Sequence, residues 1–141
     1  MYTYNIKSKR RIKAIIVVHV FGNPANIEEL LKICRKKNIE CVEDTAEGLG
    51  SFYSRGKLKN RHAGTIGKIG CLSFNGNKII TTGAGGAVIT NSKSLYKKVK
   101  YLSTQAKDDD IKYIHNEVGY NYRMPSILAA LGITQLKSLE K

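Results

Sequence analysis

The 141-residue sequence lacks any apolar run long enough to cross a membrane. A transmembrane helix needs about 18 or more consecutive apolar residues, whereas the mainly apolar stretch at residues 12–21 has the length of a buried strand. Residues 1–13 contain neither the apolar segment nor the small-residue cleavage site of a signal peptide. The sequence therefore predicts a cytoplasmic protein with room for one compact domain.

Cysteine is scarce as well. The three cysteines, Cys34, Cys41 and Cys71, are an odd number and contain no closely spaced pair. A disulfide framework normally uses an even number of cysteines. A zinc site normally needs a Cys-x-x-Cys motif or a cluster of His and Cys, and neither occurs. The pattern predicts reduced, buried thiols and no metal site.

Acidic residues are few, because 11 Asp and Glu stand against 24 Lys and Arg, for a formal net charge of +13. Such an excess of positive charge raises nucleic acid as a partner. The basic residues are nevertheless scattered over several predicted elements, and no strip of aromatic residues accompanies them, as single-strand binding would favour. An anionic substrate explains the charge as well, so nucleic acid is an alternative partner and not the favoured one.

The first part of the chain predicts a strand–helix–strand unit. Residues 14–20 form an apolar, β-branched run typical of an inner parallel strand, and residues 39–42 form a second strand. Between them, Asn26 is expected to cap a helix that ends near Lys37. Ligands of open α/β sheets bind at the carboxyl ends of the strands. Asp44 follows the second strand at such an end.

The rest of the chain predicts a mostly parallel mixed sheet flanked by helices, which is an α/β fold. The expected elements are a short strand and polar turn (48–61), a strand (69–74), a second strand (87–90), a helix capped by Ser92, a flexible polar loop (104–116) and a final helix from Pro125 to the end of the chain. This layout leaves apolar faces uncovered. It points to a fragment or to a chain with an obligate partner.

Two polar clusters follow predicted strands and carry candidate chemistry. In residues 43–47, Asp44 can stay ionised if it meets a cationic ring nitrogen. In residues 73–78, Lys78 lies on a glycine-containing loop, where a desolvated lysine can attack a carbonyl as the free amine. Ser73 and its neighbouring amides could hold a phosphate. Taken singly, such an aspartate is more often a turn former and such a lysine is more often a solvated surface residue.

Two further runs are less specific. Residues 81–86 contain three glycines, but they precede a strand and lack both the Gly-x-Gly-x-x-Gly fingerprint and a P-loop lysine. A tight turn in which backbones approach closely is the better interpretation. Residues 119–124 contain Asn121 and Arg123, which either bind an anion or cap and snorkel at the start of the last helix.

Taken in order, these runs closely resemble the DegT/DnrJ/StrS family of pyridoxal-phosphate (PLP)-dependent aminotransferases, which act on nucleotide-linked sugars. The resemblance covers about residues 12–141 and is carried by five runs: 18–22, 43–47, 73–78, 81–86 and 119–124. It implies the aspartate-aminotransferase fold (PLP fold type I). Residues 14–141 would form part of its large domain, and residues 1–13 would be a basic leader left from an upstream region.

The resemblance also implies roles for single residues. Lys78 matches the catalytic lysine that attaches PLP covalently and then moves protons as general acid and base. Asp44 matches the carboxylate that pairs with the ring nitrogen, and Ser73 matches a phosphate ligand. Asn121 matches a residue that reaches the cofactor phosphate of a dimer partner. Glu47 stands where relatives often carry Gln or His near the ring hydroxyl.

The implied reaction moves an amino group from glutamate to a keto-sugar nucleotide in amino-sugar and surface-polysaccharide biosynthesis, in a homodimer. Relatives with His in place of the lysine catalyse dehydration, so Lys78 favours amino transfer. No segment matches the family's first helix or its small domain, and we therefore expect this chain alone to bind PLP poorly and to turn over little. The alternatives are a non-catalytic partner of a full-length homologue and a basic nucleic-acid-binding α/β module.

Overall fold

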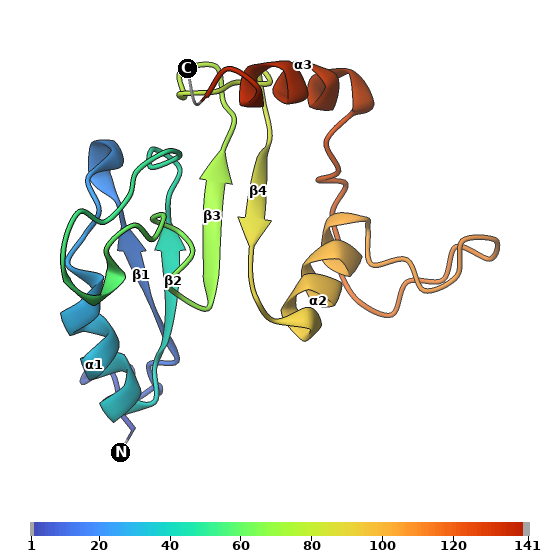
Figure 1. Ribbon diagram of the computed structural model, residues 1–141. Coiled ribbons are helices and arrows are strands. Elements are labelled where there is room, and N and C mark those ends of the chain that lie inside the picture. Colours follow the sequence, from blue (N-terminus) through green and yellow to red (C-terminus); the bar gives the residue numbers. More distant parts are fainter. Residues whose placement is uncertain (1, 140–141) are drawn as a thin grey trace.

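The computed structural model describes residues 2–139, and a four-stranded sheet lies at its centre (Figure 1). The strands lie side by side in chain order: β1 (Ala14–Val18), β2 (Glu40–Asp44), β3 (Ile69–Ser73) and β4 (Gly86–Ile89). β2 is parallel to both of its neighbours, whereas β4 runs antiparallel to β3. The predicted mostly parallel mixed sheet is confirmed.

Helix α1 (Ile27–Lys37) connects β1 to β2, as predicted. Two glutamates in its first turn and three basic residues in its last turn stabilise the helix through favourable interactions with its dipole. Asn38 ends the helix in the left-handed conformation, with a φ of 52°. Asn26 occupies the N-cap position, but the predicted capping hydrogen bond from its side chain is absent. Its ψ of 69° departs from the extended conformation that turns a capping side chain back toward the helix.

The hydrophobic core lies between α1 and the first two strands. Its buried members are Val17, Ile27, Cys34 and Cys41, and partly buried residues surround them: Ile15, Ala25, Leu30, Leu31, Ile39, Tyr53, Leu58 and Ile66. Apolar residues of α1 recur every three or four positions, so that they form one stripe facing the sheet. The three cysteines are free thiols, of which Cys71 is only half-buried.

The connection between β3 and β4 returns the chain through a tight turn. The Phe74 N–H donates to the Gly85 carbonyl at 2.9 Å. Gly85 has a φ of 108°, which L side chains rarely adopt. A Cβ on Gly86 would lie 2.3 Å from the Leu72 carbonyl oxygen. The interpretation of residues 81–86 as a close-approach turn is confirmed.

Two helices follow the sheet, α2 (Lys93–Ser103) and α3 (Ser126–Leu136). The Ser92 hydroxyl accepts a hydrogen bond from the Leu95 N–H at 3.4 Å, so the predicted cap is confirmed. A largely apolar, open pocket of about 630 Å³ lies between α2 and the β3–β4 pair. α3 lies across the carboxyl end of β3 (Figure 1), where the Gln135 side chain accepts a hydrogen bond from the Thr81 N–H at 2.6 Å. α3 ends at Leu136, whereas the helix was predicted to continue to the end of the chain, whose residues 140–141 lie outside the described residues.

Residues 104–116 form the irregular segment that was predicted, but hydrogen bonds hold it. The Asp108 carboxylate accepts from the Asn116 N–H at 2.8 Å and from the Tyr101 hydroxyl at 2.9 Å. These two donors, the Asn116 N–H first, lower the pKa of Asp108 below its usual range. The predicted flexible loop is therefore a projection fastened at its base by a carboxylate (Figure 1).

Three strand predictions differ from the structure. β2 begins at Glu40 and continues to Asp44, two residues beyond the end that was expected. β1 ends two residues earlier than expected, because Val20–Gly22 forms a 3-10 turn in which Phe21 has a φ of 51°. A positive φ is incompatible with a strand. The short strand expected within residues 48–61 is reduced to a single bridge between Phe52 and His62. Glycines with positive φ turn the chain on both sides of Phe52, so the pairing cannot extend.

Apolar side chains occupy much of the surface. On the face of β1 opposite α1, Ile16 is 70% exposed. α3 is apolar on every side and exposes four large residues: Ile127, Leu131, Ile133 and Leu136. The predicted uncovered apolar faces are confirmed. Within residues 2–139, no helix combines the length and the apolar character that spanning a bilayer requires.

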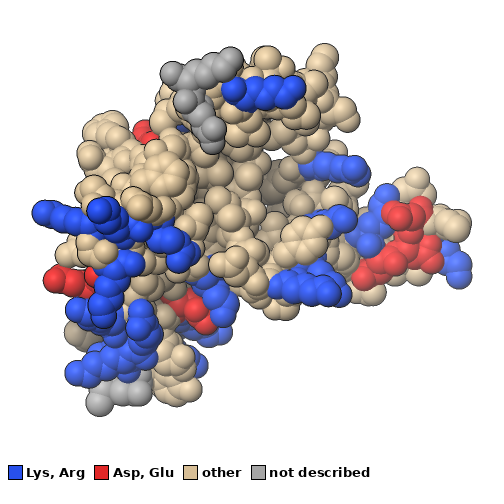
Figure 2. Space-filling view, viewed as in Figure 1, with Lys and Arg blue, Asp and Glu red and all other residues tan. Residues whose placement is uncertain are grey.

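Charged residues are unevenly distributed over the face shown in Figure 2. Lys and Arg gather over the N-terminal segment and α1, whose last turn carries Arg35, Lys36 and Lys37. The N-terminal segment is a small hairpin with a bridge between Tyr4 and Arg11. Acidic side chains gather on the projection formed by residues 104–116. Positive charge on this face is therefore densest over the N-terminal segment and α1 but continues over α2, while the acidic cluster is on the projection.

Gly70 in β3 gives a direct test of backbone packing. A Cβ at this position would lie 1.9 Å from the Gly64 carbonyl oxygen, so the backbone must shift to admit one. We expect Gly70→Ala to lower the free energy of unfolding by about 2 kcal/mol or more, measured by urea denaturation. Gly76→Ala is the matched control, because a Cβ there meets nothing within 4 Å, and its effect should stay within about 0.5 kcal/mol. Equal unfolding midpoints for both variants would contradict this packing.

Cys41 gives a pH-dependent prediction. Burial raises the pKa of its thiol from 9.0 to about 11. Because the thiolate is the reactive form, its fraction at pH 8 falls about a hundredfold relative to an unperturbed thiol. We expect iodoacetamide to label Cys41 at least that much more slowly in the folded chain than in urea, with the rate rising about tenfold per pH unit up to pH 10. Peptide mass spectrometry resolves each cysteine, and equal rates in the folded and unfolded chain would show that the thiol is not buried.

Candidate active site

Asp44 is the last residue of β2, in register with Val18 of β1 and Cys71 of β3. Its carbonyl oxygen accepts a hydrogen bond from the His19 N–H at 3.0 Å. Its carboxylate accepts one from the Ala46 N–H at 3.1 Å, which turns the chain directly after the strand. The half-buried Asp44 side chain therefore stands at the carboxyl edge of the sheet, where the sequence placed it.

Lys78 lies on the loop after β3, and its side chain reaches Glu47, three residues beyond the end of β2. Its Nζ is 3.6 Å from Oε1 of Glu47, and the Lys78 side chain is 17% exposed. The other Glu47 oxygen accepts a hydrogen bond from the Phe21 N–H at 2.8 Å. Glu47 thus joins the turn after β1 to the lysine loop, and the structure brings Lys78, Glu47 and the strand end carrying Asp44 together.

Ser73 and Asn121 lie differently. Ser73 ends β3, and its hydroxyl accepts a hydrogen bond from the Asn75 N–H at 3.3 Å, at the start of the loop that carries Lys78. Asn121 is exposed and forms a bridge with Thr104 after α2. Ser73 therefore belongs to the same sheet edge as Asp44, whereas Asn121 belongs to a separate segment of the chain.

The groups at this edge fit the chemistry of PLP. A half-buried amine supplies the nucleophile for an aldehyde. A carboxylate at the end of a neighbouring strand supplies the partner for a ring nitrogen, and a hydroxyl at a strand end supplies a phosphate ligand. Asp44, Lys78 and Ser73 provide this set of donors and acceptors from two adjacent parallel strands and the loop that follows them.

A buried network behind this edge was not identified from the sequence. Glu43 is fully buried, and its Oε2 accepts hydrogen bonds from His19 Nε2 and the Gly64 N–H, both at 2.9 Å. Its Oε1 accepts from the N–H groups of Ile66 at 2.7 Å and Gly67 at 2.5 Å. Four donors fill the lone-pair positions of one carboxylate. The available signal was a glutamate inside an apolar strand, where an unpaired charge would be costly.

The His19 ring has one arrangement of protons that satisfies its contacts. Its Nδ1 accepts a hydrogen bond from the Ala25 N–H at 3.1 Å, so this nitrogen carries no proton. Nε2 must then carry the proton and donate it to Glu43. Tyr53 contacts the same ring edge to face, with ring centroids 6.5 Å apart. Burial, followed by the nearby Glu43 charge, raises the pKa of the Tyr53 phenol to about 12.

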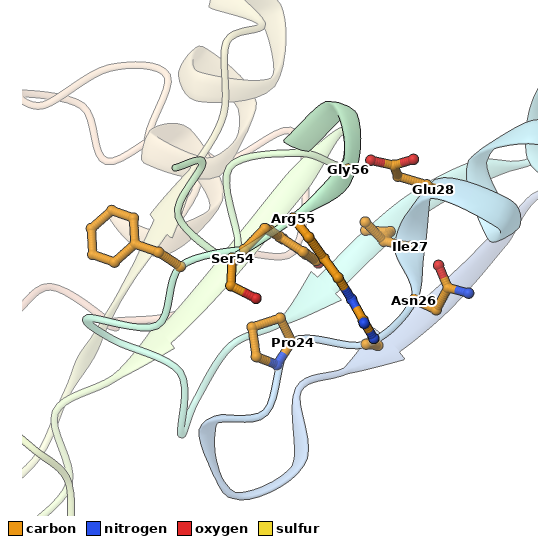
Figure 3. A pocket seen from close by; sticks show the side chains of 10 residues that line it. Pro24, Asn26, Ile27, Glu28, Ser54, Arg55 and Gly56 are labelled. Carbon is orange, nitrogen blue, oxygen red and sulfur yellow. The ribbon is translucent and has the colours of Figure 1, made fainter. Parts of the chain in front are cut away.

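A separate pocket of about 470 Å³ lies at the start of α1 (Figure 3). It is lined by residues 24–28 and 52–56, and Arg55 extends along it between Pro24 and Asn26. None of the five predicted site residues lines this pocket. The predicted site therefore lies at the strand ends and not in this hollow.

Three known proteins show what the chain is similar to. It is 40% identical over 134 residues to the GDP-perosamine synthase of Escherichia coli O157:H7, covering 95% of this chain and 35% of that protein. The structure of PseC from Helicobacter pylori, an aminotransferase involved in the biosynthesis of pseudoaminic acid, matches 91% of this chain with a TM-score of 0.80 and 33% identity. The E. coli GDP-4-keto-6-deoxy-D-mannose-3-dehydratase with bound hydrated PLP matches 92% of it with a TM-score of 0.76 and 29% identity.

The chain spans about a third of the length of these proteins, namely 35%, 34% and 36%. The matched structures have PLP fold type I, which confirms the fold class. The sequence model of the DegT/DnrJ/EryC1/StrS aminotransferase family matches residues 4–141, and so includes most of the segment interpreted as a leader. By sequence and by fold, the chain belongs to the DegT/DnrJ/EryC1/StrS aminotransferase family.

Proposed function

We propose that the chain forms part of the PLP site of a sugar-nucleotide aminotransferase. The observation that carries the proposal is the position of Lys78. Its amine lies 3.6 Å from Glu47, on the loop that follows the strand next to β2, and β2 ends at Asp44. The Lys78 amine and the Glu47 carboxylate come from segments distant in sequence and meet at the edge where α/β sheets bind ligands, and Asp44 ends a strand at the same edge. Family membership supports the same assignment.

In this proposal each residue has one task. Lys78 Nζ would hold the cofactor and would carry a proton to or from the reacting carbon. Asp44 would offer its carboxylate to a protonated ring nitrogen. Bound PLP supplies an electron sink for the pair released at that carbon. Ser73 would donate its hydroxyl to the phosphate, and Glu47, which faces Lys78 Nζ, would be available to the ring hydroxyl.

The proposed substrates are glutamate as amino donor and a nucleotide-linked keto-sugar as acceptor. The names of the related proteins support the acceptor, because they include a GDP-perosamine synthase and an aminotransferase of pseudoaminic acid biosynthesis. One structural relative is a dehydratase of a GDP-linked keto-sugar. Lys78 favours amino transfer over dehydration here, because the amine can both attach the cofactor and transfer protons.

We further infer that the site is completed by a second subunit. Asn121 is exposed and bridges to Thr104, so its side chain is available to a neighbouring molecule. The exposed apolar residues of α3 provide surface that such a neighbour could bury. The buried free thiols Cys34 and Cys41 suit a reducing compartment, and the proposal places the protein in the cytoplasm.

The covalent attachment is tested by trapping. The chain is incubated with increasing PLP, reduced with borohydride to make the lysine adduct permanent, and mapped by peptide mass spectrometry. We expect Lys78 to be modified at PLP concentrations at least tenfold lower than Lys68. Lys68 is a matched control, because its amine also faces a carboxylate, that of Glu40 at 3.4 Å, but on the open surface.

Asp44→Asn should lower trapping at Lys78 about tenfold, equivalent to about 1.4 kcal/mol, and leave trapping at Lys68 unchanged. The loss is expected because an amide cannot balance a protonated ring nitrogen as a carboxylate does. Modification of Lys78 no earlier than Lys68 in the unaltered chain would remove Lys78 from the mechanism. Equal trapping in the Asp44→Asn variant would remove Asp44 from the cofactor site.

A further inference from the structure

We propose that Glu43 and His19 are positioning residues that hold the Asp44 carboxylate in place for the cofactor ring. The role in cofactor binding rests on the proposed function. The coupling between Glu43 and Asp44 is a property of the fold and can be tested without the cofactor. These two residues are neighbours at the end of β2, and successive side chains of a strand point to opposite faces. Glu43 points toward α1, with buried Cys41 and Val17, so Asp44 points to the other face.

The Glu43 carboxylate fastens two segments directly to the end of β2, and a third through His19. It binds three N–H groups of the loop before β3, at residues 64, 66 and 67, and it binds the ring of His19 directly after β1. His19 in turn accepts from the Ala25 N–H before α1. Each contact is made by a buried or half-buried group, where hydrogen bonds to a carboxylate are strong.

The network fixes the position of Asp44 through backbone hydrogen bonds. The His19 N–H donates to the Asp44 carbonyl at 3.0 Å, so the residue whose ring binds Glu43 also holds the peptide group of Asp44. The Thr45 N–H donates to the Cys71 carbonyl at 2.9 Å on the opposite side. Two backbone hydrogen bonds therefore hold the peptide groups on either side of Asp44, and the side chain of the preceding residue, Glu43, is fixed by its own hydrogen bonds. Loosening Glu43 must change where the Asp44 carboxylate points.

Glu43→Gln is the most informative change, because it keeps the shape and replaces one acceptor by a donor. Oε1 and Oε2 each receive two hydrogen bonds from N–H groups. Whichever way the amide is oriented, its NH₂ group therefore faces two donors. Glu40→Gln is the matched control on the same strand, since Glu40 makes an exposed ion pair with Lys68 at 3.4 Å.

The first measurement is amide hydrogen exchange of the cofactor-free chain. The Ala46 N–H reports on Asp44 because it donates to that carboxylate. We expect Glu43→Gln to accelerate exchange at Ala46 at least tenfold, together with Gly64, Ile66 and Gly67, and Glu40→Gln to leave all four unchanged. Acceleration at the three loop amides without any change at Ala46 would overturn the proposal, because Glu43 would then hold the loop alone.

Two His19 variants provide the same test if Glu43→Gln fails to fold. In His19→Gln the side-chain amide nitrogen can occupy the position of Nε2 and keep the donor to Glu43. In His19→Asn the side-chain oxygen can occupy the position of Nδ1 and keep only the acceptor for Ala25. We expect exchange at Ala46 to accelerate at least tenfold in His19→Asn and less than threefold in His19→Gln. The reverse order would contradict positioning through Glu43.

The second measurement is PLP trapping at Lys78 in a double-variant cycle. If Glu43 acts through Asp44, Glu43→Gln lowers trapping about tenfold in the unaltered chain but adds no further loss to Asp44→Asn. A purely structural role would lower trapping equally in both backgrounds, and that result would sink the inference. Absence of preferential trapping in the unaltered chain would instead count against the proposed function, and the exchange measurement would still decide whether Glu43 positions Asp44.

Discussion

The buried carboxylate of Glu43 is the interaction on which the arrangement of the site depends. An unpaired charge without access to water is costly, so the fold must supply donors for it. It does so with one imidazole from the residue after β1 and with three backbone N–H groups from the loop between β2 and β3. The same requirement restricts the loop, because a Cβ on Gly67 would lie 2.7 Å from the Cys41 carbonyl oxygen.

The opposite side of the same strand end is built more openly. Glu47 is 38% exposed in its side chain, and the loop carrying Lys78 is held at its ends by backbone pairing with β4 and by Gln135 of α3. A buried, fully hydrogen-bonded network behind the sheet edge and a more exposed polar front suit the proposed site, in which one carboxylate stays fixed while a lysine changes partners. The glycine turn at residues 83–86 lets the lysine loop return close to β3.

Patterns local in sequence predicted the elements, and contacts between distant residues had to come from the structure. The apolar periodicity around Ile27 and the run at residues 14–20 were sufficient for α1 and β1, apart from the end of β1. The shared edge of Asp44 and Lys78 followed from strand direction, although their roles remain a proposal. The Asn26 cap failed because it depends on backbone angles set by the packed turn before it. The role of Glu43 was not predicted because its hydrogen-bond partners lie 21 to 24 residues away in the sequence.

The exposed apolar helix α3 and the excess of positive charge act in opposite directions between molecules. At low ionic strength a net charge of +13 keeps copies of the chain apart. The Debye length shortens to about 8 Å at physiological salt, so this repulsion weakens while the attraction between apolar faces remains. We therefore expect any self-association through these apolar faces to increase with salt. Added salt should therefore lower the solubility of this chain. Salt has the opposite effect on proteins that associate through ion pairs, because screening weakens those contacts.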